Sequence, residues 1–345
     1  MRKSTPFKLA TLTATSCLAL LATAATAKDA PTLTIENFIG TVDVRTGDFD
    51  KITITDADGA SVEQSKNSVL IDDDQTIKNA NCRKSKASIK ISVGGKNWYK
   101  RKGGYKDLDE YPFLKITAPE NTHLIIDNAI IFGAVGDIGS ADIKLRSCGN
   151  LDFANVNGHL DLRIAGSGDF TAQNIQSVEV SGAGSGDVTI GDIANTALVV
   201  SAGSGDNDIG NVGGDFDFSG AGSGDLNVGN IMGNADIKTA GSGDVEAGRI
   251  EGNLTYTSGG SGDFEADYVG GDKLSSKSGG SGTVEIDGGN VTELYVKIGG
   301  SGSARYDGRS TNAELYTGGS GAITVREPSG NLRKKKHGSG SIRIR

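Results

Sequence analysis

The sequence predicts an all-β protein built as a single-stranded parallel β-helix, a solenoid of about 19–20 residues per coil. Two observations lead to this prediction. The tripeptide Gly-Ser-Gly recurs ten times in the second half of the chain, with successive copies 18 to 20 residues apart. Between copies, apolar residues tend to alternate with polar ones, which is the period of a strand and not of a helix. The copies begin at Gly166, Gly184, Gly203, Gly222, Gly241, Gly260, Gly280, Gly300, Gly319 and Gly338.

Each interval has the composition of two or three short strands joined by tight turns. In 187–202, for example, apolar residues alternate, and Gly191 and Asn195 mark turns. Stacking such coils at the ~4.8 Å strand spacing pairs each backbone with the coils above and below. No single coil could bury its inward Val, Ile, Leu and Phe side chains, so we expect one core that runs through the whole stack.

The repeated corner predicts ladders of identical residues. A sharp bend in every coil requires φ > 0, which glycine adopts without a Cβ clash, so both glycines are expected to serve geometry. The serines, such as Ser167, Ser185 and Ser204, are expected to form a hydroxyl ladder that satisfies backbone groups at the corner.

An aspartate follows the corner in six consecutive coils. Unit charges about 4.8 Å apart repel by roughly 1 kcal/mol in water, a cost that Asx-type turns onto backbone N–H groups would offset. A row of carboxylates also suits calcium, but the nine-residue repeat of calcium-binding β-rolls is absent from the sequence, and later coils carry Thr283, Ser303, Ala322 and Ser341 in this register. The sequence therefore favours a turn over a metal site. The candidate calcium ligands are Asp169, Asp187, Asp206, Asp225, Asp244 and Asp263.

Residues 1–27 have the features of an export signal: basic residues, an apolar run and an Ala-x-Ala site at 25–27. No later stretch has the ~20 apolar residues of a membrane helix, so no transmembrane segment is expected in the mature chain. Removal of the signal takes away three positive charges, and the formal net charge falls from -8 to -11. An acidic chain is unlike a general nucleic-acid binder, whose footprint is basic.

The mature chain, residues 28–345, is expected to form one β-helix domain. Alternating segments begin near residue 32, before the first Gly-Ser-Gly, and a degenerate copy of the corner lies at 147–150. We therefore expect irregular coils over 32–147 and regular coils over 148–345.

A basic insertion interrupts the irregular coils at 75–106. It contains ten lysines and arginines, no Asp or Glu, and glycine pairs that indicate a hairpin. An exposed basic and aromatic loop on an acidic rod is the best candidate for a specific contact, with an anionic glycan, a lipid headgroup or another surface protein as partner. The alternative is a solvated extension held partly by the rod's negative field. The candidate contact residues are Trp98, Tyr99, Lys100, Arg101 and Lys102.

Two cysteines, Cys82 and Cys148, remain in the mature chain. In an exported protein two cysteines most simply form one disulfide, which here would tie the insertion to the first regular coil. The three histidines lack the spacing of zinc ligands, and no cofactor is expected.

The last residues carry a basic cluster next to a final strand. An open coil end invites strand addition, which such a cluster could discourage by charge; alternatively the cluster could be an attachment point. We favour the protective interpretation. The cluster comprises Arg333, Lys334, Lys335, Lys336, Arg343 and Arg345.

The Gly-Ser-Gly-Asp corner with its companion Gly-[Asp/Asn]-[Ile/Val], as at 191–193, 210–212 and 229–231, resembles the family described as putative auto-transporter adhesin, head GIN domain. The resemblance covers most of the mature chain, including the strand-to-proline step at 114–119. It implies a right-handed coil and an adhesive role, and it transfers no catalytic residue. The basic insertion departs from the family pattern, and no translocating barrel follows in the sequence, so we do not expect the chain itself to be an autotransporter.

The sequence thus predicts an exported, non-enzymatic β-helix protein of the periplasm, the outer-membrane surface or the extracellular space, acting as an adhesin or binding scaffold. Two alternatives stay open. Polysaccharide lyases and hydrolases also use parallel β-helices, but such an enzyme needs a singular pair of carboxylates, whereas the carboxylates here form ladders. A structural envelope protein could assemble end to end through its C-terminal coil.

Overall fold

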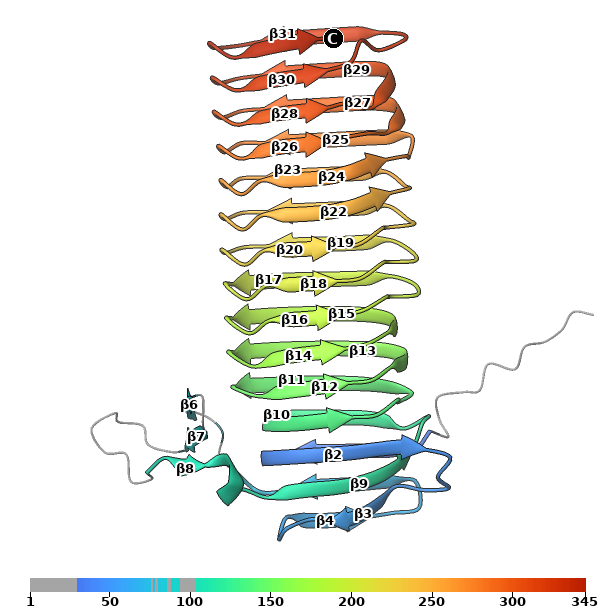
Figure 1. The fold of residues 1–345 in the computed structure, drawn as a ribbon, viewed down its shortest axis with the longest axis vertical. Coiled ribbons are helices and arrows are strands. Elements are labelled where there is room, and N and C mark those ends of the chain that lie inside the picture. The colour runs from blue at the N-terminus through green and yellow to red at the C-terminus, as the bar shows by residue number, and fades with distance from the viewer. Residues whose placement is uncertain (1–29, 76, 78–79, 86–87, 94–103) are drawn as a thin grey trace, which may run out of the picture.

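The computed structural model describes residues 30–75, 77, 80–85, 88–93 and 104–345. These residues form a long rod of stacked parallel coils (Figure 1). Within the described ranges the one helix is a short 3-10 turn, η1 (Leu108–Glu110), and all other elements are strands. The predicted fold class, an all-β parallel solenoid, is confirmed.

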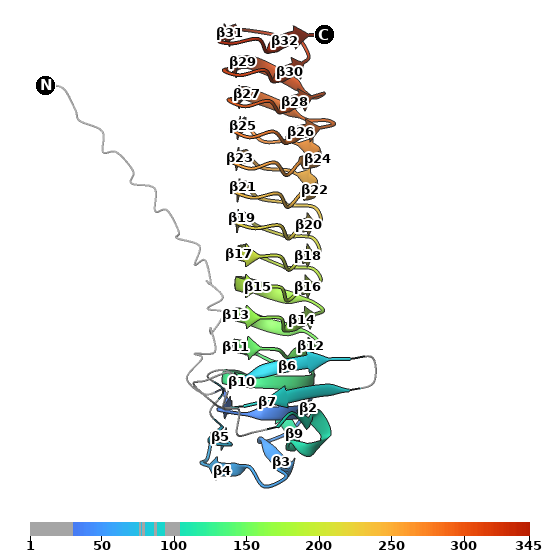
Figure 2. The ribbon, with the colours of Figure 1, turned by 90° about the vertical axis from the view of Figure 1, so that its left-hand side faces the viewer.

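Two stacks of strands form two walls of the rod, seen side by side in Figure 2. Each strand pairs in parallel with the equivalent strand one coil above and one below. The first wall comprises β11 (Ser140–Ser147), β13 (Val156–Gly166), β15 (Ile175–Gly184), β17 (Ala197–Gly203), β19 (Phe216–Gly220), β21 (Ala235–Thr239), β23 (Leu254–Ser258), β25 (Lys273–Ser278), β27 (Asn290–Ile298), β29 (Arg309–Thr317) and β31 (Leu332–Lys336). The second wall comprises β12 (Asn150–Phe153), β14 (Asp169–Ala172), β16 (Val188–Ile190), β18 (Asn207–Ile209), β20 (Leu226–Val228), β22 (Val245–Ile250), β24 (Phe264–Val269), β26 (Thr283–Ile286), β28 (Ser303–Tyr306), β30 (Ala322–Val325) and β32 (Ser341–Ile344).

A third side closes each of the middle coils with a single bridged residue, and in later coils it pairs over two residues. Parallel bridges join Ile175 to Ile193, Ile193 to Val212, and Val212 to Ile231. The Gly-Ser-Gly corner connects the first wall to the second, and the Gly-[Asp/Asn]-[Ile/Val] segment leads from the second wall to the third side. Both sequence repeats therefore mark corners of the coil.

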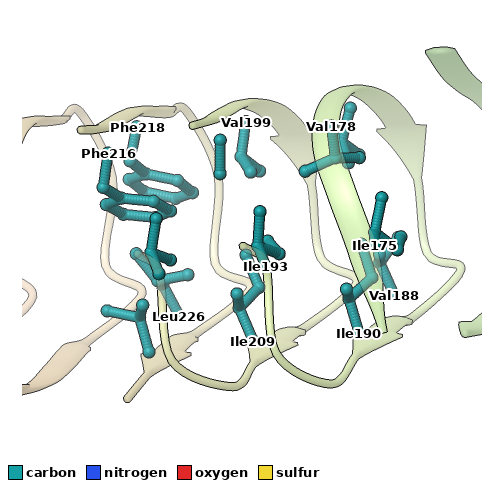
Figure 3. Packing of buried hydrophobic residues seen from close by; sticks show 14 of the residues in the cluster. Ile175, Val178, Val188, Ile190, Ile193, Val199, Ile209, Phe216, Phe218 and Leu226 are labelled. Atoms are coloured by element: carbon teal, nitrogen blue, oxygen red, sulfur yellow. The ribbon is translucent and has the colours of Figure 1, made fainter. Parts of the chain in front are cut away.

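The core is a set of columns in which each inward side chain lies above its equivalent in the coil below. On the first wall, Val199 pairs with Val180 below and Phe218 above, and all three are buried. Figure 3 shows these columns meeting Ile193 and Ile209 from the other two sides. Because each full burial of such a side chain contributes about 1.5–3 kcal/mol, the stabilisation accumulates with every added coil.

The coils at the N-terminal end do not stack in chain order. The first coil, β1 (Thr32–Glu36) and β2 (Ile39–Gly47), lies between two later ones. Below it are β5 (Ser68–Asp72) and β9 (Phe113–Pro119), and above it is the long β10 (His123–Val135). Two antiparallel strands, β3 (Thr53–Asp56) on β9 and β4 (Ser61–Gln64) on β5, border this end of the sheet.

The corner glycines are required mainly because successive coils approach closely, and less because of φ. Of the ten first glycines of the corner, Gly166, Gly184 and Gly338 have a φ in the left-handed range. At the others, a Cβ would overlap the backbone carbonyl of the glycine one coil below. That carbonyl accepts a hydrogen bond from the serine N–H of the next coil, as from Ser223 to Gly203 at 2.9 Å. The prediction that φ > 0 explains these glycines is thus correct for the first glycine of three corners. It is wrong for the first glycine of the other corners and for the second glycine of every corner.

Replacing Gly260 with alanine is expected to destabilise the rod, because the new Cβ would overlap the carbonyl of Gly241 and force two coils apart. A loss of about 1–3 kcal/mol in the free energy of unfolding is expected, measured by urea denaturation. The adjacent Gly259 is the matched control, since nothing lies within 4 Å of a Cβ added there. Equal stability of Gly259→Ala and Gly260→Ala would contradict the close-approach explanation.

Candidate functional site

The described part of the basic insertion forms a small antiparallel sheet beside the rod. Its strands are β6 (Asn81–Lys84), β7 (Ile89–Ser92) and β8 (Lys106–Asp107). We call this sheet together with η1 the flap. Figure 1 shows it projecting from the side of the rod near β10. The strands on either side of the glycine pairs that predict a hairpin are β7 and β8, which pair antiparallel, and β6 adds a third strand on the other edge of β7.

The flap packs on the rod through a second hydrophobic core, separate from the axial one. Ile39, Ile130 and Phe132 on the outside of the rod are covered by Ile91 and by Tyr111, which follows η1. The Tyr111 hydroxyl donates a hydrogen bond to the Ile91 carbonyl at 3.3 Å, and burial raises the pKa of this phenol. The base of the insertion is therefore a packed module and not a solvated extension.

A disulfide, a hydrogen bond and an ion pair attach the flap to the first regular coils. Cys82 and Cys148 form a disulfide with a Cα–Cα distance of 6.1 Å, the pairing that the sequence predicts. The Ser147 hydroxyl donates to the Ala80 carbonyl at 3.1 Å, and the Lys84 ammonium lies 3.3 Å from the Asp169 carboxylate. The hydrogen bond and the ion pair could not be predicted from the sequence, because each joins two residues that are far apart in the chain and do not belong to a repeat.

The predicted ligand-contact residues, Trp98, Tyr99, Lys100, Arg101 and Lys102, lie outside the described residues. The neighbouring described cations are held by the flap itself. The Arg83 guanidinium lies 4.2 Å from the centroid of the Tyr105 ring, and Lys90 pairs with Asp107 at 3.2 Å. These contacts hold together the described strands that precede and follow residues 94–103 in the chain.

The aspartate ladder bonds coil to coil. One carboxylate oxygen of each aspartate accepts the backbone N–H of the residue in the same register of the next coil, at 2.6–3.3 Å, from Asp169 up to the N–H of Thr283. The other two corners of the coil use the same contact. Asp192 and Asn211 accept from the coil above on one corner, and Asp215 and Asn234 on the other.

This geometry differs from the predicted Asx turn, in which each side chain would bond within its own coil, but it supports a structural role for the ladder. One oxygen of each carboxylate is already bonded to a backbone N–H group. Within the described residues, no three or more His, Cys, Asp or Glu side chains are arranged to hold a metal ion.

The same part of the chain contains no helix long and apolar enough to cross a bilayer.

The last strand of the first wall, β31, carries cations at inward positions, which in the coils below are occupied by buried side chains. Lys334 lies above the buried Leu315, and Lys336 lies above the buried Thr317, while every residue of β31 is exposed. Charged side chains at inward positions discourage the addition of another strand. The arrangement supports the protective interpretation of this cluster.

Replacing Asp225 with alanine is expected to lower the free energy of unfolding by about 0.5–1.5 kcal/mol, because the Asp244 N–H loses its acceptor. Asp225→Asn keeps the acceptor oxygen and removes a repelling charge, so its stability should equal or exceed that of the wild type. Urea denaturation compares the two variants, and equal loss in both would show that charge, not the hydrogen bond, matters. Calcium titration of the same proteins tests the metal alternative.

Replacing both Cys82 and Cys148 with alanine should loosen the flap without unwinding the rod. The disulfide closes a separation of 66 residues, which corresponds to about 4 kcal/mol in the chain-entropy model. Hydrogen exchange is expected to accelerate in β6 and β7 and to stay unchanged in β20 to β30. Faster exchange along the whole rod would contradict the flap's independence.

Comparisons with known proteins come from three searches. Residues 237–345 match the model of the family described as putative auto-transporter adhesin, head GIN domain. A search of curated proteins finds no match. A solved structure, of a putative adhesin from Bacteroides fragilis, is similar at 16% identity over 92% of this chain and 93% of that chain, with a TM-score of 0.17, which is too low to bear on the fold.

The family match falls on β21 to β32, where the Gly-Ser-Gly corners and the columns above them are regular. It does not include the flap or the coils that stack out of chain order. Over residues 237–345 the chain is therefore similar to the putative auto-transporter adhesin, head GIN domain family, which confirms the resemblance carried by its repeated corners.

Proposed function

We propose that the protein is an exported, non-enzymatic binding protein of the cell envelope or surface, with an adhesin-like role. The observation that carries the proposal is the flap, a basic module clamped to the side of an acidic rod by a second core, a disulfide and an ion pair. The match to an adhesin family supports a binding role. The disulfide supports an oxidising location, such as the periplasm or the cell exterior.

The basic insertion is opposite in charge to the coils of the rod beside it. Residues 137–272 contain 21 Asp and Glu against 5 Lys and Arg, whereas residues 75–106 contain ten Lys and Arg and no acid. The acidic coils of residues 137–272, which we call the shaft, repel anions along their length. An anionic partner is therefore attracted selectively to the basic insertion. The proposed partner is an anionic glycan, a lipid headgroup or an acidic surface protein.

The ladders argue against a hydrolytic site. A glycosidase needs two carboxyl groups of different character placed across a bond. The five aspartates from Asp187 to Asp263 instead share one environment, each exposed and each bonded to the next coil, and only Asp169, which pairs with Lys84, differs. This equivalence favours a scaffold over the polysaccharide-active alternative. No contact within the described residues bears on end-to-end assembly.

Replacing Lys100, Arg101 and Lys102 with glutamine should reduce binding to anionic ligands at least tenfold, since the segment's charge is the proposed attraction. A glycan array and vesicles containing phosphatidylglycerol provide the ligands. The control, Lys51→Gln/Lys66→Gln/Lys115→Gln, removes the same charge from the N-terminal end of the rod. Equal binding by both triple variants would place the contact elsewhere, and a Trp98→Ala variant tests the aromatic share.

A further inference from the structure

A second surface of the rod combines aromatic rings with cations on the outside of the first wall. Tyr295 on β27 and Tyr316 on β29 have ring centroids 5.5 Å apart. The Lys277 ammonium on β25 lies 5.7 Å from the Tyr295 ring, and the Arg333 guanidinium on β31 lies 5.9 Å from the Tyr316 ring. Lys297 lies directly between Lys277 and Tyr316 in the same column. We call these five residues the tyrosine–lysine face.

Lower in the rod, the same outward column carries cations that are neutralised. Lys144 pairs with Asp127 at 3.2 Å, Arg163 with Asp161 at 2.8 Å, and Lys238 with Asp236 at 2.9 Å. Among the described residues, Lys277 and Lys297 have no such carboxylate partner, although they are neighbours in consecutive coils. Two like charges about 4.8 Å apart repel by roughly 1 kcal/mol in water, a cost that a bound anion would relieve.

The acids next to this face are already engaged. Glu314 accepts a hydrogen bond from the Tyr316 hydroxyl at 2.8 Å and lies 3.7 Å from Arg333, while Glu293 accepts from the Asn312 amide at 2.7 Å. The hydrogen bond to Glu314 raises the pKa of the Tyr316 phenol. A shallow hollow of about 470 Å³ opens beside Tyr295 and Lys277.

The whole upper end of the rod differs in charge from the shaft below. Residues 273–345 contain 12 Lys and Arg against 6 Asp and Glu, the reverse of the balance in 137–272. The face spans the four coils from β25 to β31, roughly 15 Å at the strand spacing. The uppermost rod residue that the flap contacts is Asp169 at the start of β14. The coil of β25 lies six coils above it, about 30 Å along the rod at the strand spacing, so the two surfaces are separate.

We propose that the tyrosine–lysine face binds a short segment of an anionic polysaccharide, with its carboxylates or sulfates on Lys277 and Lys297 and its sugar rings on Tyr295 and Tyr316. The half-buried rings of Tyr295 and Tyr316 supply flat apolar contact with a polar tip, and ammonium groups supply charge-assisted hydrogen bonds. The inference adds a second contact to the proposed binding role and depends on it.

A polysaccharide fits this face better than a membrane or a nucleic acid. An anionic bilayer lying along the wall would also meet the acids lower in the same wall, such as Asp217 and Asp236. The face offers no large aliphatic side chain for insertion between lipids. A long nucleic acid would extend onto the negative shaft, whereas a flexible polysaccharide can contact four coils and leave the surface.

The test compares two double variants of the full chain in calorimetric titrations with oligogalacturonate, sulfated dextran, neutral dextran and phosphatidylglycerol vesicles. Lys277→Gln/Lys297→Gln is expected to weaken the affinity for at least one anionic polysaccharide about tenfold and to reduce its salt dependence. Lys144→Gln/Lys238→Gln removes the same charge from ion-paired positions of the same column and should change the affinity less than twofold. Hydrogen exchange should show ligand protection in β25 to β29.

Each other outcome overturns the inference. Equal weakening by both double variants would indicate general attraction, and protection confined to the flap would place the ligand there. Binding to vesicles but to neither anionic polysaccharide would assign the face to membranes. In these cases the wild type still binds an anionic ligand, so the proposed function stands. If the wild type binds no probe and no glycan on the array, both the proposed function and this inference are wrong. Tyr295→Leu adds a readout for stacking, since it should weaken binding without altering the salt dependence.

Discussion

The constraint on which the rod depends is the hydrogen bond between equivalent backbone groups of successive coils. At the Gly-Ser-Gly corner this bond brings a carbonyl into the space that a Cβ would occupy, so glycine recurs there in every coil. Aspartate and asparagine recur at the corners because their side-chain oxygens satisfy the remaining N–H groups across the same gap. The sequence is periodic because each coil makes the same contact with the next coil.

Inward and outward positions are constrained differently by this stacking. Inward columns must stay apolar and similar in volume, as in the column that contains Val199 and Phe218. Outward columns meet only solvent and the coil above and below, so their chemistry can change from coil to coil without altering the fold. One outward column accordingly runs from ion-paired Lys238 through Thr257 to Lys277, Lys297 and Tyr316.

The sequence therefore predicts well what repeats and poorly what occurs once. The coil length, the corners, the shared core and the aspartate ladder all follow from periodicity, and the disulfide follows from there being two cysteines. The placement of β1 between β5 and β10, the second core under the flap, and the Lys84–Asp169 pair are single long-range contacts, which no local pattern encodes. A positive φ does not account for most of the corner glycines because φ is a property of one residue, whereas the decisive contact is with the coil below.

The two cationic surfaces lie near opposite ends of the acidic segment, the flap beside its first coils and the tyrosine–lysine face above its last, which gives the rod a defined spacing between them. The columns of the shaft hold its coils in register, so this spacing does not vary as it would across a flexible linker. If both proposed surfaces bind anionic polymers, a single polyanion that reaches both would bind the second one at high effective concentration, while the acidic coils between them repel it. Avidity would then select long or clustered anionic polymers over isolated ones, although each surface alone contributes only modest affinity.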